Sequence, residues 1–145
     1  MDKVKYKMEW TITTEQELHQ IADQVAPQLS IGDVVALNGT LGVGKTTFVR
    51  ALVQKLIGHP IDVPSPTFTL LQSYDTPNFT LYHFDFYRLK SPQEAYEIGI
   101  EDAFADGVSM LEWPDKIGSL LPQKHKTISF EILPNGKRHI IAEGF

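Results

Sequence analysis

The chain has 145 residues, of which 42% are hydrophobic and 21% are charged, and its net charge at pH 7 is −5. This length suits one domain and is too short for two ordinary ones, so we expect a single domain over residues 1–145. No stretch approaches the roughly 18 continuous apolar residues of a membrane span, so we expect no membrane association. The acidic balance, with only three arginines, argues against tight binding of DNA or RNA by the chain alone.

The N-terminus and the absence of cysteine indicate the compartment. Residues 1–8 contain lysines but no apolar core behind them, which is not the pattern of a secretory signal. A chain without cysteine has no disulfides and no thiolate metal site, as is common in a reducing environment. We therefore expect a cytoplasmic protein.

The first predicted elements are a strand and a helix. Residues 7–12 alternate loosely between polar and apolar and predict an edge strand. Thr14 and Glu17 have capping-box spacing, in which the Thr14 hydroxyl accepts the Glu17 N–H and the Glu17 carboxylate accepts the Thr14 N–H. The helix that follows has one apolar face and is expected to end at Pro27.

Residues 39–46 have the pattern G-x-x-x-x-G-K-T, which is typical of a phosphate-binding loop, or Walker A motif. A buried strand is predicted before it, over residues 34–37, and an amphipathic helix after it, over residues 47–57. This order points backbone N–H groups and the positive end of the helix dipole at an anion. In such loops Lys45 reaches the β- and γ-phosphates and the Thr46 hydroxyl binds magnesium, roles that a simple turn would not need. The loop residues expected to contact the nucleotide are Gly39, Thr40, Leu41, Gly42, Val43, Gly44, Lys45, Thr46 and Thr47.

A proline-rich segment follows this helix. Three prolines fall within residues 60–66, which excludes both a helix and a central strand. The prolines would hold Ser65 and Thr67 in fixed positions. The segment is either a stiff connector or a functional loop beside the phosphate site, and the local sequence leaves both open.

The rest of the chain alternates apolar runs, helical patterns and turns. In order, these predict a strand–turn–strand unit over residues 69–87, a helix from Ser91 that Gly99 interrupts, a strand over 108–111, a short helix over 115–121 and a hairpin over 126–142. We therefore predict an α/β, single-domain P-loop NTPase-like fold, with a mixed central sheet flanked by helices and a C-terminal β-hairpin.

Two acidic residues follow predicted strands. A phosphate-loop enzyme needs an acid at a strand end to hold magnesium, directly or through water, and Asp85 and Glu112 both qualify. Each acid has a simpler alternative. Asp85 could form an ion pair with Arg88, and Glu112 could lie in solvent at the end of its strand. Two such acids downstream of one loop favour a metal role for at least one. We expect His83, on the same strand face as Asp85, to be a hydrogen-bonded interior residue and not a metal ligand.

Arginine content and position narrow the class of enzyme. The lid of a phosphate-loop kinase requires a cluster of arginines, and no such cluster follows Asp85 in the sequence. The sequence also has no Asn-Lys-x-Asp string, the motif that selects guanine in GTPases. Arg138, on the last hairpin, either contacts the base or ribose of the nucleotide or points into solvent. Trp113 is expected to pack in the interior and not to serve as a platform for stacking bases.

Four motifs together resemble the TsaE (YjeE) family of small bacterial ATPases of tRNA threonylcarbamoyladenosine synthesis. The similarity extends from about residue 18 to residue 133. The motifs are residues 39–47, Ser65-Pro-Thr-Phe68, His83-Phe-Asp-Phe-Tyr-Arg-Leu89 and Glu112-Trp-Pro114.

The resemblance implies a magnesium-dependent ATPase that works with TsaD and TsaB on the adenosine beside the anticodon, and that reaches tRNA through this complex. It implies that Thr46 and Glu112 bind the metal, that Asp85 supports the metal and water, and that Thr67 acts near the γ-phosphate beside Lys45. It also places a nucleotide contact near Arg138, and it places Trp113 near the same site.

One residue departs from the family pattern, which usually has Asp or Glu where this chain has Thr40. Loss of that carboxylate removes a repulsion beside the phosphates and also a group that can orient water. A small-molecule kinase and a non-hydrolysing nucleotide-binding regulator are the alternative functions.

Overall fold

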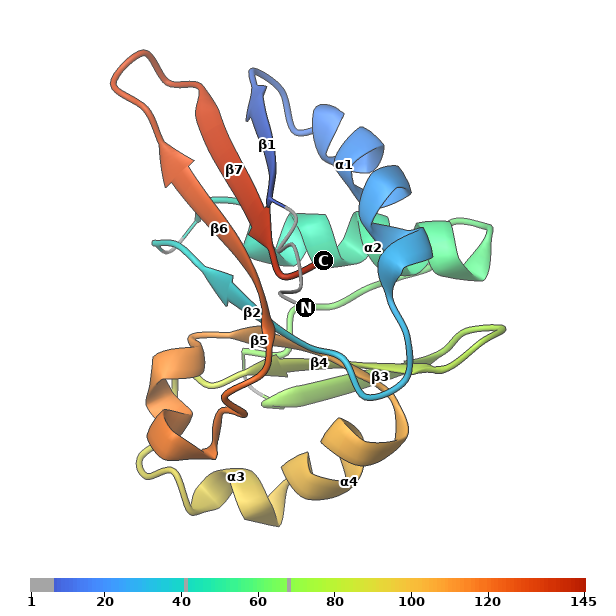
Figure 1. Cartoon of the computed structure of the whole chain (residues 1–145), viewed down its shortest axis with the longest axis vertical. Helices are drawn as coiled ribbons and strands as arrows, with labels where there is room; N and C mark the ends of the chain where they lie inside the picture. The colour runs from blue at the N-terminus through green and yellow to red at the C-terminus, as the bar shows by residue number, and fades with distance from the viewer. Residues whose placement is uncertain (1–6, 41, 68) are drawn as a thin grey trace, which may run out of the picture.

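The computed structural model describes residues 7–40, 42–67 and 69–145. Its strands form one mixed seven-stranded sheet in the order β1-β7-β6-β2-β5-β4-β3 (Figure 1). The central strands β6, β2, β5 and β4 are parallel to their neighbours within this group, while β1, β7 and β3 pair antiparallel. The strands are β1 Lys7–Ile12, β2 Val34–Asn38, β3 Leu71–Asp75, β4 Thr80–Asp85, β5 Val108–Glu112, β6 Lys126–Ile132 and β7 Arg138–Glu143.

Helices cover both faces of this sheet. The pair α1 and α2 lies on one side, and α3 and α4 lie on the other (Figure 1). The helices are α1 Glu17–Val25, α2 Lys45–Ile57, α3 Glu94–Glu97 and α4 Ile100–Asp106, with 3₁₀ helices η1 Ala26–Gln28 and η2 Pro114–Leu120. The prediction of a mixed α/β sheet flanked by helices is confirmed. Among the described residues, no helix is long and apolar enough to cross a membrane.

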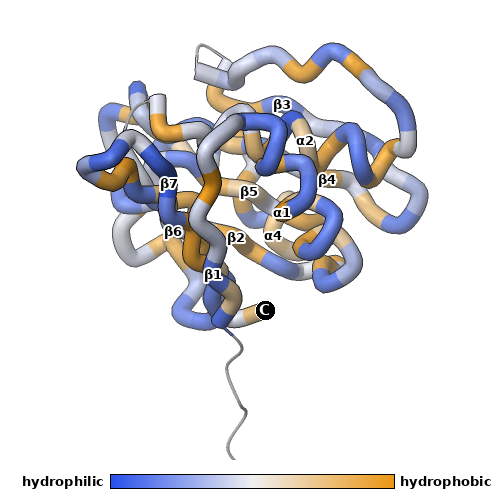
Figure 2. Tube along the Cα trace, turned by 90° about the horizontal axis from the view of Figure 1, so that it is seen from above, coloured by the Kyte–Doolittle hydropathy of each residue, from blue (hydrophilic) through white to orange (hydrophobic). Residues whose placement is uncertain are grey.

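Two apolar cores result from this arrangement. The larger core joins α1 and α2 to the sheet and includes Leu18, Phe48 and Leu81, whereas the smaller one joins α3, α4 and η2 to the opposite face and includes Phe84. Leu81 and Phe84 belong to the same strand, and strand alternation sends them to opposite faces. A sheet covered on both faces has apolar central strands, and Figure 2 shows hydrophobic residues along β2 and β5.

The predicted capping box before α1 is half right. The Glu17 carboxylate accepts the N–H groups of Thr13 at 2.6 Å and of Thr14 at 3.3 Å, as such a box requires. The Glu17 N–H donates to the Thr14 carbonyl at 3.2 Å, however, and not to its hydroxyl. A backbone turn therefore takes the place of the predicted side-chain cap. As expected, the α-helix stops before Pro27, which lies in η1.

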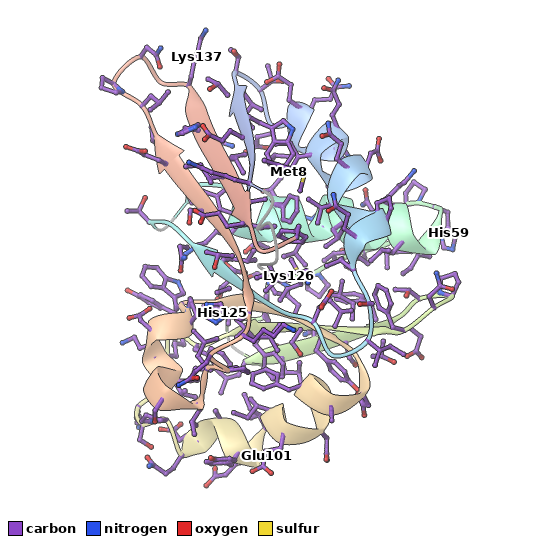
Figure 3. The ribbon with its side chains drawn as sticks, viewed as in Figure 1. Met8, His59, Glu101, His125, Lys126 and Lys137 are labelled. Carbon is purple, nitrogen blue, oxygen red and sulfur yellow. The ribbon has the colours of Figure 1, made fainter. Side chains whose placement is uncertain are left out.

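Later elements follow the prediction with small shifts. The α-helical hydrogen bonds of α3 begin at Glu94, three residues after Ser91, and Gly99, with a φ of 87°, separates α3 from α4. The predicted short helix near residue 115 is the 3₁₀ helix η2. The C-terminal hairpin is formed by β6 and β7. Figure 3 shows Lys137 at the tip of this hairpin and Glu101 on the outer side of α4.

Candidate functional site

The predicted phosphate loop connects β2 to α2. Gly39 has a φ of 150°, and a Cβ atom there would lie 2.8 Å from Val43 Cγ1 and 2.9 Å from the Phe130 carbonyl oxygen. Any larger residue would push the loop away from β6. Gly44, with a φ of 117°, directly precedes α2, whose first N–H groups are free of helical partners and suit an anion. Leu41, also predicted to contact the nucleotide, lies outside the described residues.

A cleft of about 350 Å³ opens beside the N-terminus of α2. It brings together residues from the loop, the proline-rich segment, β4 and β5, which are far apart in the sequence. Its predicted members are Gly42, Gly44, Lys45, Thr46, Thr47, Thr67, Asp85 and Glu112. Three other predicted residues, Gly39, Thr40 and Val43, do not line the cleft and form the part of the loop nearer to β2.

Lys45 is held by the loop itself. Its side chain is almost fully buried, its Nζ donates to the Gly39 carbonyl at 2.7 Å, and the same atom lies 4.0 Å from the centre of the Trp113 ring. Burial lowers the pKa of Lys45, and the attraction of Glu112, Asp85 and Asp115 opposes this effect. A bound phosphate offers the ammonium stronger partners than a neutral carbonyl and an aromatic face.

Glu112 connects the end of β5 to α2. Its carboxylate is 4% exposed, so the alternative of a solvated strand end is wrong. The Thr46 hydroxyl donates to Glu112 Oε2 at 2.9 Å. Since that hydroxyl gives its hydrogen to Glu112, its oxygen lone pairs remain available to a cation.

Asp85 connects the end of β4 to the proline-rich segment. Its Oδ2 accepts the Thr67 hydroxyl at 3.1 Å, and its Oδ1 accepts the Tyr87 N–H at 2.9 Å. The Ser65 hydroxyl lies 2.8 Å from the Thr67 hydroxyl, and both residues line the cleft. The proline-rich segment is therefore a wall of the cleft, which favours the functional-loop interpretation over a plain connector.

The two acids occupy equivalent positions on neighbouring strands. Asp85 and Glu112 are register partners at the carboxyl ends of the parallel strands β4 and β5. Within the described part of the chain, no group of three His, Cys, Asp or Glu residues suits a metal on its own. Magnesium commonly takes one or two protein ligands and completes its shell with phosphate oxygens and water. Thr46, Glu112 and Asp85 therefore fit a magnesium ion that arrives with a nucleotide.

His83 is fully buried, and its Nε2 lies 2.6 Å from Glu112 Oε2. The prediction of a hydrogen-bonded interior histidine is confirmed. Its partner was not predicted, because 29 residues separate the two in the chain. The available signal was the position of His83, two residues before Asp85 on the same strand face.

Arg138 reaches the phosphate loop from β7. Its Nη1 lies 3.2 Å from the position of a Cβ on Gly44 and has no hydrogen-bond partner in the described part of the chain. Its Nη2 lies 3.8 Å from the carboxylate of Glu15, a cleft residue that the sequence did not indicate. The alternative of a solvent-exposed arginine is wrong, since the side chain is 24% exposed.

Trp113 lies in the wall of the cleft, which the packing prediction did not anticipate. Besides facing Lys45, its ring contacts Tyr87 at a centroid distance of 5.1 Å. Its φ of 56° is unusual for a residue other than glycine. Trp113 stands between the last residue of β5, Glu112, and the first residue of η2, Pro114.

Comparisons with known proteins identify the family of the chain. A family model described as threonylcarbamoyl adenosine biosynthesis protein TsaE matches residues 12–140. The TsaE protein of Rickettsia bellii is 42% identical over 127 residues, which cover 88% of each chain. The TsaE protein of Bacillus subtilis is 34% identical over 135 residues, which cover 92% of this chain and 84% of that one.

A solved structure gives the same result at the level of the fold. The crystal structure of Bacillus subtilis YdiB superposes with a TM-score of 0.80 at 29% identity, covering 99% of this chain and 88% of that chain. The family model covers β2 to β6 and the first half of β7, and residues from all four sequence motifs line the same cleft. The chain belongs to the TsaE family of threonylcarbamoyl adenosine biosynthesis proteins.

Proposed function

We propose that the chain is a magnesium-dependent ATPase required for threonylcarbamoylation of the adenosine next to the anticodon in tRNA. Family membership supports the pathway, and we infer that TsaD and TsaB are its partners in the cytoplasm and that tRNA is reached through them. The observation that carries the nucleotide part is the hydrogen bond from Thr46 to Glu112, which ties the phosphate loop to a strand-end acid.

The nucleotide phosphates would lie at the N-terminus of α2. The N–H groups of Gly44, Lys45 and Thr46 begin that helix, and the positive end of its dipole favours an anion. Lys45 would exchange its bond to the Gly39 carbonyl for the β- and γ-phosphate oxygens. Arg138, whose Nη1 is buried beside Gly44 and has no hydrogen-bond partner among the described residues, would complete the contacts to the nucleotide.

The acids and hydroxyls of the cleft would hold magnesium and the attacking water. Thr46 and Glu112, with Asp85 beside them, are the residues that would hold the ion, which when bound offsets the charge of the phosphates. Thr67, fixed by its bond to Asp85, would orient water near the γ-phosphate. Thr40 would contact the nucleotide as part of the loop, and its uncharged side chain would neither repel the phosphates nor orient water as a carboxylate does.

We propose that hydrolysis is slow until partner proteins complete the site. Among the described residues that line the cleft, Arg88 is the single arginine, and no arginine cluster surrounds the phosphate position. An arginine supplied by another protein accelerates phosphoryl transfer by about 10³–10⁵-fold in related systems. A site built in this way hydrolyses ATP at a useful rate only within its complex.

The test compares release of inorganic phosphate by the isolated chain and by the chain with TsaD and TsaB, in the presence of magnesium. We expect a low rate alone and a marked rise with the partners, accompanied by modified tRNA. A high rate for the isolated chain would contradict completion by partners. Transfer of the phosphoryl group to an added metabolite would identify a kinase instead, and tight binding with no turnover under any condition would identify a regulator.

Glu112→Gln tests the role of the strand-end acid, because it keeps the shape of the side chain and removes its charge. We expect hydrolysis to fall by about 10²–10³-fold, the usual effect of losing one group that stabilises a transition state electrostatically. Unchanged magnesium-dependent binding and hydrolysis in this variant would show that Glu112 has neither a metal nor a catalytic role.

A further inference from the structure

Hydrophobic packing does not explain why a histidine occupies position 83 in the interior, because a buried ring nitrogen without a partner destabilises the fold. It is fully buried in β4 within the apolar sheet, and only one of its two ring nitrogens has a partner. Nδ1 is buried without a hydrogen-bond partner in the described part of the chain. Burying an unpartnered polar atom destabilises a fold, and a leucine would fill the same space without this penalty. The second ring nitrogen must therefore account for the histidine.

That second nitrogen, Nε2, contacts an oxygen that is already engaged. Glu112 Oε2 accepts the Thr46 hydroxyl at 2.9 Å and lies 2.6 Å from His83 Nε2. A carboxylate oxygen only accepts hydrogen bonds, so we assign the ring hydrogen to Nε2. His83 is then a donor, and a single oxygen of Glu112 is held by donors from two elements, β4 and α2.

The sheet register explains how His83 reaches Glu112. His83 is opposite Met110, and Asp85 is opposite Glu112, on the neighbouring parallel strands. His83 therefore lies one residue pair deeper in the sheet than the two acids, on the same face. From this position the ring of His83 contacts the Glu112 carboxylate from the interior of the sheet, and the Thr46 hydroxyl contacts the same carboxylate from the side of the cleft.

We propose that His83 is a positioning residue for magnesium. Its Nε2–H fixes the Glu112 carboxylate so that the carboxylate and the Thr46 hydroxyl are already oriented for the ion that enters with the nucleotide. This rests on the magnesium–ATP function proposed above. His83 itself touches neither the ion nor the nucleotide. Loss of such an outer hydrogen bond to a metal ligand typically lowers metal affinity or activity by about 10–100-fold.

The test uses two variants of the full chain. His83→Leu removes the donor and puts an apolar side chain in its place. His83→Gln instead supplies an amide N–H near the position of Nε2. In His83→Leu we expect the magnesium concentration for half-maximal binding of a fluorescent ATP analogue to rise about 10-fold or more, and in His83→Gln to stay within about 3-fold. Binding of the analogue in EDTA should be unchanged in both, because the contacts of the loop to phosphate are untouched.

Ser109→Ala is the matched control in the same sheet. Ser109 is buried in β5, and its hydroxyl has no hydrogen-bond partner within residues 7–40, 42–67 and 69–145; strand alternation places it on the face opposite Glu112. We expect a wild-type magnesium requirement from it. The unfolding temperature of every variant reports whether the fold is intact.

Several results would overturn the inference. One is a wild-type magnesium requirement in folded His83→Leu, and another is an equal defect in His83→Gln and His83→Leu. If His83→Leu does not fold, His83→Asn replaces it, since its amide reaches the position of Nδ1 and not that of Nε2; an equal magnesium requirement in the Asn and Gln variants would also overturn the inference. Absence of magnesium-dependent binding by the wild-type chain would instead refute the proposed function itself.

Discussion

On the α3–α4 face of the sheet, β4 and β5 present Phe84 and Leu111 to an apolar core. On the α1–α2 face, the same two strands present His83, Asp85 and Glu112. Both faces are buried, so burial does not distinguish them; the chemistry of the buried groups does. The buried polar residues of the described chain are Lys45, His83, Asp85, Ser109 and Glu112.

All of these except Ser109 belong to the cleft or contact it. A strand with period-two alternation can thus build a core with one set of side chains and a site with the other. The comparison teaches that changes on the two faces should separate: stability should respond on the α3–α4 face, and nucleotide chemistry on the α1–α2 face.

The largest effect is expected from Phe84→Ala. Phe84 is fully buried, and its ring centroid lies 5.4 Å from that of Phe86 and 6.4 Å from that of Tyr82. Truncation should lower the free energy of unfolding by about 3–5 kcal/mol through lost transfer energy and a cavity. Denaturant unfolding measures this, and nucleotide affinity per folded molecule should be unchanged. A loss of affinity in the folded fraction would break the separation of the two faces.

Lys45→Met should show the opposite pattern. Burial lowers the pKa of Lys45, so its charged form is disfavoured in the folded chain and its removal should not lower the unfolding temperature. Hydrolysis with partners should fall by about 10²–10³-fold, because a charge directed at the phosphates is lost. Thermal unfolding with and without ATP measures both, and the stabilisation by ATP should disappear. A strongly destabilised variant would show that Lys45 also supports the fold.

Thr67→Val should have a moderate effect confined to the chemical step. The variant keeps the shape of the side chain and removes the bond to Asp85 Oδ2. The hydroxyl that would orient water near the γ-phosphate is lost, so we expect a fall in kcat of roughly 10-fold or more. Nucleotide affinity, measured by titration, should change little. Equal losses in kcat and affinity would place Thr67 in ground-state binding.

Ser109→Ala should have the smallest effect. Its hydroxyl lies on the α3–α4 face and has no partner in the part of the chain that the structure describes, so we expect the free energy of unfolding to stay the same or to rise by about 1 kcal/mol. Differential scanning calorimetry resolves a change of this size. A clear loss of stability or of activity would reveal a role for this hydroxyl.

Local patterns in the sequence predicted the elements well. The helix α2 and the β6–β7 hairpin each depend on residues close together in the chain, and both are confirmed. Half of the predicted cap before α1 was wrong. The Glu17 N–H donates to the Thr14 carbonyl, because a backbone turn competes with the Thr14 hydroxyl for that N–H.

Contacts between distant residues were beyond the reach of these patterns. The bond of His83 to Glu112 depends on the pairing of β4 with β5, and the place of Arg138 beside Gly44 depends on the order of β7 in the sheet. Strand order follows from packing of the whole chain, which no single window contains. The strand-end acids were found because their chemistry, and not their partners, marks them.

The order of the strands has a consequence for how the chain is made. β1 forms ladder bonds with β7, and β7 lies between β1 and β6. During synthesis, β1 can therefore join the sheet only after β7 has been made. Arg138 is on that last strand, so a nascent chain has its phosphate loop long before the arginine beside it. A chain that lacks β7 therefore also lacks the arginine beside its phosphate loop.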